Sequence, residues 1–299
     1  MPRTKSKSLN LSLKSKEGNE AVIELDGALI SRLILGNEDV IKYPLKEDDP
    51  KKGYPSALLF PFPNRIKDAR YTFEGKEYTL DINDTDSHNA IHGLIAFERF
   101  ELVSQSENKA KLKYVYHGHN EGYPFPFEFM VEYSLSGHQL KVVVEGINTG
   151  ETNMPVGFAW HPYFGFGSAP IGEMEVKAPR RVKMELSERN IPTGESETER
   201  AGLIPLKNTI LDSVFTLPEG ENSSENTIEL RFKRKKLLVS QKTGKNKLNY
   251  FVLYTPPSRD CIAIEPQSCN TNAFNNEEGL VVLKPGKKVK YEMSVKLEA

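Results

Sequence analysis

Short runs in which apolar and polar residues alternate recur along the chain, and they constrain its fold more than any other feature. They occupy residues 20–27, 111–118, 128–137, 139–148 and 289–299, and Val, Ile, Tyr and Phe dominate them. Alternation with a period of two is typical of strands that bury one face. No stretch of twelve residues or more has a convincing helical period. We therefore expect an all-β protein.

Turn-forming residues indicate how these strands are connected. The segments "FEGKEYTL" (73–80) and "LSGHQLKV" (135–142) each place a glycine between two strand-like runs, which predicts tight hairpins. Residues 187–208 and 218–227 are polar and interrupted by proline or glycine, so we expect surface loops there. Many short hairpin-linked strands need two packed sheets or a closed barrel to bury them.

Nothing in the sequence divides the chain. No tandem repeat or low-complexity linker interrupts it, so we predict a single domain over residues 1–299, with residues 1–19 as a flexible polar tail. The chain has 40 basic and 41 acidic residues, a balance that predicts neither a nucleic-acid nor a membrane partner. It has two cysteines, Cys261 and Cys269, and no secretory signal. We expect a cytoplasmic monomer or homodimer with reduced thiols.

Asn64 and Arg65 are the first candidate ligand groups. They lie between a proline-rich entry, "FPFP", and a strand, where ligand-binding residues held by a scaffold are often found. An arginine presents a fixed fork of donors that suits hydroxyl or carboxylate oxygens. The alternative is a surface ion pair, which is the commoner role of an arginine taken alone.

A second segment, "SHNAIHGL" (87–94), contains His88 and His92. Their spacing of four would suit a metal site on a helix, but Asn89 and Gly93 argue against a helix, and no third ligand is evident. We predict no metal site. A zinc hydrolase that uses the two histidines remains the alternative.

His161 lies in the most apolar of the candidate segments, "GFAWHPYF" (157–164), which contains the chain's one tryptophan. A buried histidine held by packing is one interpretation. The other is a proton-transfer group in a sugar pocket, because pyranose rings have apolar faces and ligand pockets combine aromatic surface with a few fixed polar groups.

The fourth segment, "CIAIEPQSCNTNAFN" (261–275), places a carboxylate in an apolar strand. Alternation puts Cys261, Ala263 and Glu265 on one face and the two isoleucines on the other, and Pro266 is expected to end the strand. Glu265 is then either a surface residue at a strand end or a partly desolvated base with a raised pKa.

Taken together, these segments resemble the galactose mutarotase, or aldose 1-epimerase, family. Five short motifs occur in the family's order: "NRI" (64–66), "NAIHG" (89–93), "HPYF" (161–164), "LDSVF" (211–215) and "EPQ…NAFN" (265–275). The resemblance extends from about Glu20 to the C-terminal "LKPGKKVKYEMSVKL".

The resemblance implies a fold, an activity and a set of site residues. The fold would be a single large β-supersandwich of antiparallel strands, and the activity would be interconversion of the α and β anomers of a free sugar, without metal or cofactor. The implied roles are general base for Glu265, general acid for His161, a shared donor role for His92, and substrate binding for Arg65, Asp212 and Asn64.

Two alternatives remain on the same fold. A hexose-6-phosphate epimerase would need a basic cluster beside the pocket, for which Arg65, Arg70 and Arg99 are available, although Ala96 stands where those enzymes have a phosphate-binding arginine. A non-catalytic sugar-binding protein would be favoured if Glu265 or His161 were replaced, and neither is.

Overall fold

Two large antiparallel sheets account for most of the structure. The computed structural model describes residues 10–42, 53–218, 220 and 223–298. Within these ranges each of the two sheets has nine strands, and their neighbouring strands pair antiparallel. The all-β, antiparallel expectation is confirmed.

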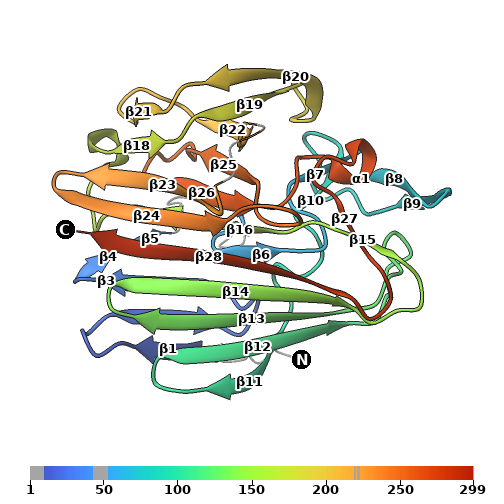
Figure 1. Ribbon diagram of the computed structural model, residues 1–299, viewed down its shortest axis with the longest axis horizontal. Coiled ribbons are helices and arrows are strands. Elements are labelled where there is room, and N and C mark those ends of the chain that lie inside the picture. The colour runs from blue at the N-terminus through green and yellow to red at the C-terminus, as the bar shows by residue number, and fades with distance from the viewer. Residues whose placement is uncertain (1–9, 43–52, 219, 221–222, 299) are drawn as a thin grey trace, which may run out of the picture.

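The first sheet contains the longest strands and lies across the front of Figure 1. Its spatial order is β11 (Glu101–Gln105), β12 (Lys109–Tyr116), β13 (Phe127–Ser136), β14 (Gln139–Asn148), β28 (Lys288–Glu298), β24 (Lys235–Lys242), β23 (Glu225–Phe232), β18 (Glu175–Ala178) and β21 (Gly202–Pro205). In the middle of this sheet, β28 pairs with β14 along one edge and with β24 along the other.

The second sheet carries the candidate site. Its main path is β20 (Pro192–Glu199), β19 (Arg181–Leu186), β22 (Asp212–Thr216), β25 (Tyr250–Tyr254), β26 (Ile262–Gln267), β16 (Ala159–His161) and β6 (Ala57–Leu59). Two short strands, β17 (Tyr163–Phe164) and β5 (Ile41–Lys42), extend it beside β26.

Smaller elements flank the two sheets. They are a sheet of β1 (Asn10–Lys14), β2 (Glu20–Glu24), β3 (Ile30–Leu35) and β4 (Glu38–Asp39); the pairs β7 (Arg65–Lys67) with β10 (Asn89–Ile91), β8 (Arg70–Phe73) with β9 (Lys76–Thr79), and β15 (Met154–Val156) with β27 (Val281–Leu283); the 3₁₀ turn Ile171–Glu173; and α1 (Ala273–Asn276). On the right of Figure 1, α1 lies beside β7 and β8. No helix in the described ranges has the length and apolar character needed to cross a membrane.

Aromatic side chains join the two large sheets in one core. Phe158, which precedes β16, contacts Phe129 of β13 with ring centroids 6.1 Å apart and Tyr291 of β28 at 5.3 Å. Phe60, which follows β6, contacts Phe127 at 4.9 Å. Because all five rings are buried, each sheet removes the apolar face of the other from water.

Both predicted hairpins are present. Ser136 pairs with Gln139 across the β13–β14 turn, and Phe73 pairs with Lys76 across the β8–β9 turn. Gly137 and Gly75 adopt positive φ angles of 53° and 78° in these turns, a conformation that a residue without a Cβ adopts at little cost.

The expectation of a polar tail over residues 1–19 is wrong from Asn10 onward. Residues 10–14 form β1, which pairs with β2, and Leu13 is fully buried. The alternation "NLSLK" is too short to stand out among the neighbouring lysines and serines. Residues 1–9 lie outside the described residues.

The predicted loop over residues 187–208 is also wrong in part. Residues 192–199 form β20 at the edge of the second sheet, and residues 202–205 form β21 at the edge of the first. Most side chains of both strands are exposed, so the apolar alternation that marks a half-buried strand is missing. The second predicted loop, 218–227, lies partly outside the described residues, and Glu225 already belongs to β23.

Candidate active site

Glu265 lies in β26, inside the second sheet, with its side chain only 5% exposed. The predicted alternation is confirmed: Ile264 packs in the main core, whereas Cys261 and Ala263 form a small separate cluster with Tyr163. Glu265 lies two and four positions after Ala263 and Cys261 along the strand, so its side chain points to the same face of the sheet as theirs.

The expectation that Pro266 ends this strand is wrong, because β26 continues to Gln267. On the β16 side, the amide of Ile264 donates to the carbonyl of Pro162 at 3.3 Å, and the amide of Ser268 donates to Phe158 at 2.8 Å. Pro266 occupies the position between these two donors. The proline therefore removes one ladder hydrogen bond without interrupting the strand.

His161 is brought to Glu265 by strand pairing. It ends β16, which lies between β26 and β6. Its Nε2 atom lies 3.4 Å from Oε1 of Glu265, and its side chain is 7% exposed. The preceding residue, Trp160, is fully buried in the main core, so the two faces of "AWH" separate the packing residue from the polar one.

His92 and two tyrosines surround His161. The ring centroid of His92 is 5.4 Å from that of His161, nearly perpendicular to it at 85°. Tyr54 contacts His92 edge-on at 4.5 Å, and Tyr163 lies 5.0 Å from His161. His92 has a φ of 65°, directly after β10, and this unusual backbone directs the chain out of the strand at the site. The aromatic surroundings expected for His161 are present.

Arg65 and Asn64 lie beside β10, because β7 pairs with it. The Nε atom of Arg65 donates to Oδ2 of Asp84 at 2.7 Å, and its Nη1 donates to Oδ1 of Asn64 at 3.3 Å. The Arg65 and Asp84 side chains are 19% and 14% exposed, so this is not the surface ion pair of the alternative interpretation. Protein contacts therefore fix the orientation of the guanidinium.

Asp84 and its neighbour Asn83 are site residues that the sequence analysis missed. The Asn83 side chain accepts from the amide of Ile91 at 2.7 Å, donates to the carbonyl of Ile91 at 3.0 Å and donates to the hydroxyl of Tyr54 at 3.4 Å. These two residues hold Arg65 and the end of β10. No local signal marks them, because their partners are distant in sequence.

Asp212 begins β22, two strands from β26. It lies opposite Tyr254 of β25, which in turn lies opposite Ala263 of β26. Asp212 is exposed, yet its charge raises the pKa of Glu265. The structure thus gathers the six predicted site residues around one face of the second sheet.

Burial controls the protonation of this cluster. It raises the pKa of Glu265 well above its usual value, with a further rise from Asp212 and an opposing effect from Arg65. Burial also lowers the pKa of His161 to about 4 and, with help from His161 and Arg65, lowers that of His92. Burial therefore favours the protonated form of Glu265 and the neutral forms of both imidazoles.

Glu265 and His161 are close enough to share one proton. Because Nε2 of His161 is in contact with the carboxyl, the same proton can lie on either group without a change in total charge. The Nδ1 atoms of His161 and His92 are buried and have no hydrogen-bond partner among the described residues.

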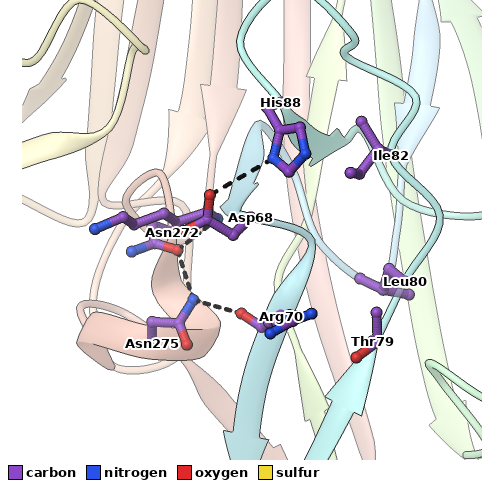
Figure 2. A pocket seen from close by; sticks show the side chains of 9 residues that line it. Asp68, Arg70, Thr79, Leu80, Ile82, His88, Asn272 and Asn275 are labelled. Atoms are coloured by element: carbon purple, nitrogen blue, oxygen red, sulfur yellow. Dashed lines mark hydrogen bonds and ion pairs between the residues drawn. The ribbon is translucent and has the colours of Figure 1, made fainter.

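His88, the second histidine of "SHNAIHGL", lies in another pocket. Its Nδ1 atom is 3.7 Å from Oδ1 of Asp68, in a polar pocket of about 800 Å³ that Arg70 and Asn275 also line (Figure 2). His92 does not line this pocket. The described residues contain no group of three or more His, Cys, Asp or Glu side chains placed to hold a metal.

The three arginines that were candidates for a phosphate site have different surroundings. Arg99 pairs with Asp26 at 3.0 Å, Arg70 lines the pocket of Figure 2, and Arg65 pairs with Asp84. No contact among the described residues joins the three in one basic cluster beside Glu265, so we do not favour a phosphorylated sugar.

Comparisons with known proteins identify the family to which the chain is similar. A family model described as aldose 1-epimerase matches residues 10–296. The uncharacterized protein YihR of Escherichia coli is 26% identical over 93% of this chain and 89% of its own length. Galactose mutarotase of Rattus norvegicus is 33% identical, over 48% of this chain and 42% of its own length.

Solved structures share the fold at low sequence identity. A GalM/aldose epimerase homologue from C. elegans has a TM-score of 0.84 at 18% identity and covers 97% of this chain and 99% of its own. Galactose 1-epimerase from Lactobacillus acidophilus has a TM-score of 0.80 at 17% identity, with coverage of 100% and 97%.

Proposed function

The chain belongs to the aldose 1-epimerase family, and from that premise we propose that it interconverts the α and β anomers of a free hexose. The observation that carries the proposal is the buried contact of 3.4 Å between Nε2 of His161 and Oε1 of Glu265. Both reacting oxygens of a pyranose, O1 and O5, are bonded to C1. An acid and a base that serve them must therefore lie close together, as these two groups do.

In the proposed reaction, the ionised Glu265 takes the proton of the O1 hydroxyl while protonated His161 donates to O5. The electron pair on O1 forms the aldehyde C=O bond as the C1–O5 bond breaks. Rotation about C1–C2 presents the other face of the aldehyde. The ring then closes with both proton transfers reversed, so the enzyme regains its starting state.

The reactive form requires the proton on His161 and the negative charge on Glu265, which is one of the two arrangements of a proton shared by this pair. Arg65 favours this form, because its positive charge lowers the pKa of Glu265. We assign substrate binding to Arg65, Asp212 and Asn64, and a share of the donor role to His92.

Polarimetry of freshly dissolved α-glucose, α-galactose and glucose 6-phosphate tests the activity, with exchange of a free hexose as the expected result. Glu265→Gln tests the mechanism, because the amide keeps the shape but removes the proton acceptor. We expect anomer exchange to fall by about 10²–10⁴-fold while sugar still binds. Saturation-transfer NMR and a sugar titration measure both quantities on one sample.

The matched control is Glu151→Gln, which changes an exposed carboxylate and should leave exchange unaltered. Exchange by Glu265→Gln at the wild-type rate would refute the acid–base assignment. If the wild-type protein binds sugar but does not exchange its anomers, it is a non-catalytic sugar-binding protein.

A further inference from the structure

Arg189 lies at the tip of the hairpin that joins β19 to β20, and it binds a segment far away in the sequence. Its Nε atom donates to the carbonyl of Ser87 at 2.9 Å, and its Nη2 atom lies 2.7 Å from Oδ1 of Asp68. The same Nη2 atom lies 3.0 Å from the carbonyl of His88 and 3.3 Å from Oδ1 of Asn89. The Arg189 side chain is 40% exposed, and ordering so long a side chain at the surface costs conformational entropy. These contacts therefore make Arg189 more than a solvated surface charge.

The segment that Arg189 binds has an unusual backbone. His88 has a φ of 55° immediately before β10, and a residue with a Cβ keeps this left-handed conformation only when its surroundings stabilise it. The guanidinium supplies such support, because it binds the carbonyl of His88 and the carbonyl of the residue before it. Figure 2 shows His88 beside Asp68, the carboxylate that also pairs with Arg189. We expect loss of the Arg189 side chain to loosen the entrance to β10.

The strand β10 connects this entrance to the candidate site. Its first residue, Asn89, is fully buried and exchanges two backbone hydrogen bonds with Asp84, both at 3.1 Å. Asp84 in turn accepts from Nε of Arg65 at 2.7 Å. Directly after the other end of β10, the amide of His92 donates to the carbonyl of Asn64 at 2.9 Å. A displacement of β10 would therefore move several groups of the site together.

The hairpin that carries Arg189 belongs to the same sheet as Glu265. Its first strand, β19, pairs with β22, whose first residue is Asp212. The antiparallel register brings the end of β19 toward the start of β22. At the tip, the amide of Ser187 donates to the carbonyl of Ile191 at 2.8 Å, and Ile191 is buried, so the turn is well fixed. Arg189 thus ties the sheet of Glu265 and Asp212 to the strand pair β7–β10.

We propose, resting on the proposed function, that Arg189 is a positioning residue of the sugar site. It acts through Asn89 and keeps Arg65 in the orientation that binds the sugar, and it takes no part in proton transfer. The shape of the guanidinium matters for this role, because its planar fork reaches the Ser87 carbonyl and the Asp68 carboxylate at once. A lysine ammonium keeps the charge but does not reproduce that fork.

The first experiment measures KM and kcat for anomer exchange of a free hexose by saturation-transfer NMR. The variants are Arg189→Ala, Arg189→Lys and the matched control Arg200→Ala, which changes an exposed arginine directly after β20. We expect Arg189→Ala to raise KM about tenfold with a smaller change in kcat, because Arg65 binds the sugar whereas Glu265 transfers the proton. Arg189→Lys should recover only part of this loss, and the control should match wild type. Denaturant titration of each variant separates an effect on the site from a loss of the fold.

A double-mutant cycle with Asp84→Asn tests the route of the effect. If Arg189 acts through Asp84, both substitutions remove the same restraint on Arg65. Arg189→Ala/Asp84→Asn should then raise KM about tenfold, whereas independent effects would multiply to about a hundredfold. The same cycle in the Glu265→Gln background, measured as the dissociation constant of the sugar in a titration, does not depend on turnover.

Four results would overturn the positioning role while leaving the proposed function intact. They are a KM for Arg189→Ala equal to that of Arg200→Ala, a lower denaturant midpoint without a change in KM, a wild-type KM in Arg189→Lys, and multiplicative effects in the cycle. If the wild-type protein neither exchanges nor binds a hexose, the proposed function itself fails, and the positioning role fails with it.

Discussion

Because His161 is buried, we expect the free energy of unfolding to depend on pH in a way that can be measured without any activity assay. An unfolded histidine has a pKa near 6.5, and burial lowers that of His161 to about 4. Between these values the unfolded state binds a proton that the folded state does not. Stability from this group is thus complete above pH 6.5 and is lost as the pH falls toward 4. From pH 7 to pH 5 the loss is about 2 kcal/mol.

Glu265 titrates with the opposite sign, because its raised pKa favours the folded state at low pH. The comparison is therefore made in the Glu265→Gln background, where this group no longer titrates. Glu265→Gln should lose about 2 kcal/mol more unfolding free energy between pH 7 and pH 5 than Glu265→Gln/His161→Asn. Urea denaturation at the two pH values gives both losses.

The matched control is Glu265→Gln/His117→Asn, which removes an exposed imidazole and should behave as Glu265→Gln does. Equal losses in Glu265→Gln and Glu265→Gln/His161→Asn would show that His161 is not kept neutral by burial. The account of the shared proton would then be wrong.

Three further perturbations test other parts of the structure. Asp84→Asn should raise KM for the sugar about tenfold with a smaller change in kcat, because the substitution releases Arg65 from its partner. The control Asp86→Asn, at an exposed carboxylate, should change neither constant, and equal effects of the two variants would refute the positioning role of Asp84. Gly157→Ala would push a Cβ into the sulfur of a buried cysteine and should cost about 1–3 kcal/mol by denaturant titration, and an unchanged midpoint would contradict this packing. Exchange activity should survive dialysis against a chelator, since the described residues offer no cluster of three metal ligands; loss that zinc reverses would contradict it.

Alternation made much of the site predictable from sequence. The alternation from Cys261 to Glu265 predicted which side chains share a face of the strand, and the structure confirms that the isoleucines lie in the main core and Cys261 and Ala263 in a separate cluster. The sequence left open whether Glu265 is a surface residue or a desolvated base; in the structure it is buried, and burial raises its pKa.

Features that depend on tertiary contacts could not be predicted. Asp84 reaches Arg65 only because β7 and β10 fold together, and nothing near Asp84 in the sequence announces it. The polar strand β20 pairs along one edge with β19 and has no buried face to mark it. Pro266 remains in a strand because the ladder can lose one donor.

The central position of β28 has a consequence for synthesis. This strand follows every other strand of the first sheet along the chain, yet it joins the half that ends at β14 to the half that begins at β24. While a ribosome makes the protein, the two halves have no shared edge until residues 288–298 emerge. Until then β14 and β24 expose unpaired backbone, a state that invites pairing between nascent chains. Closure of this sheet is therefore a late step that depends on contacts between residues far apart in sequence, which slows folding.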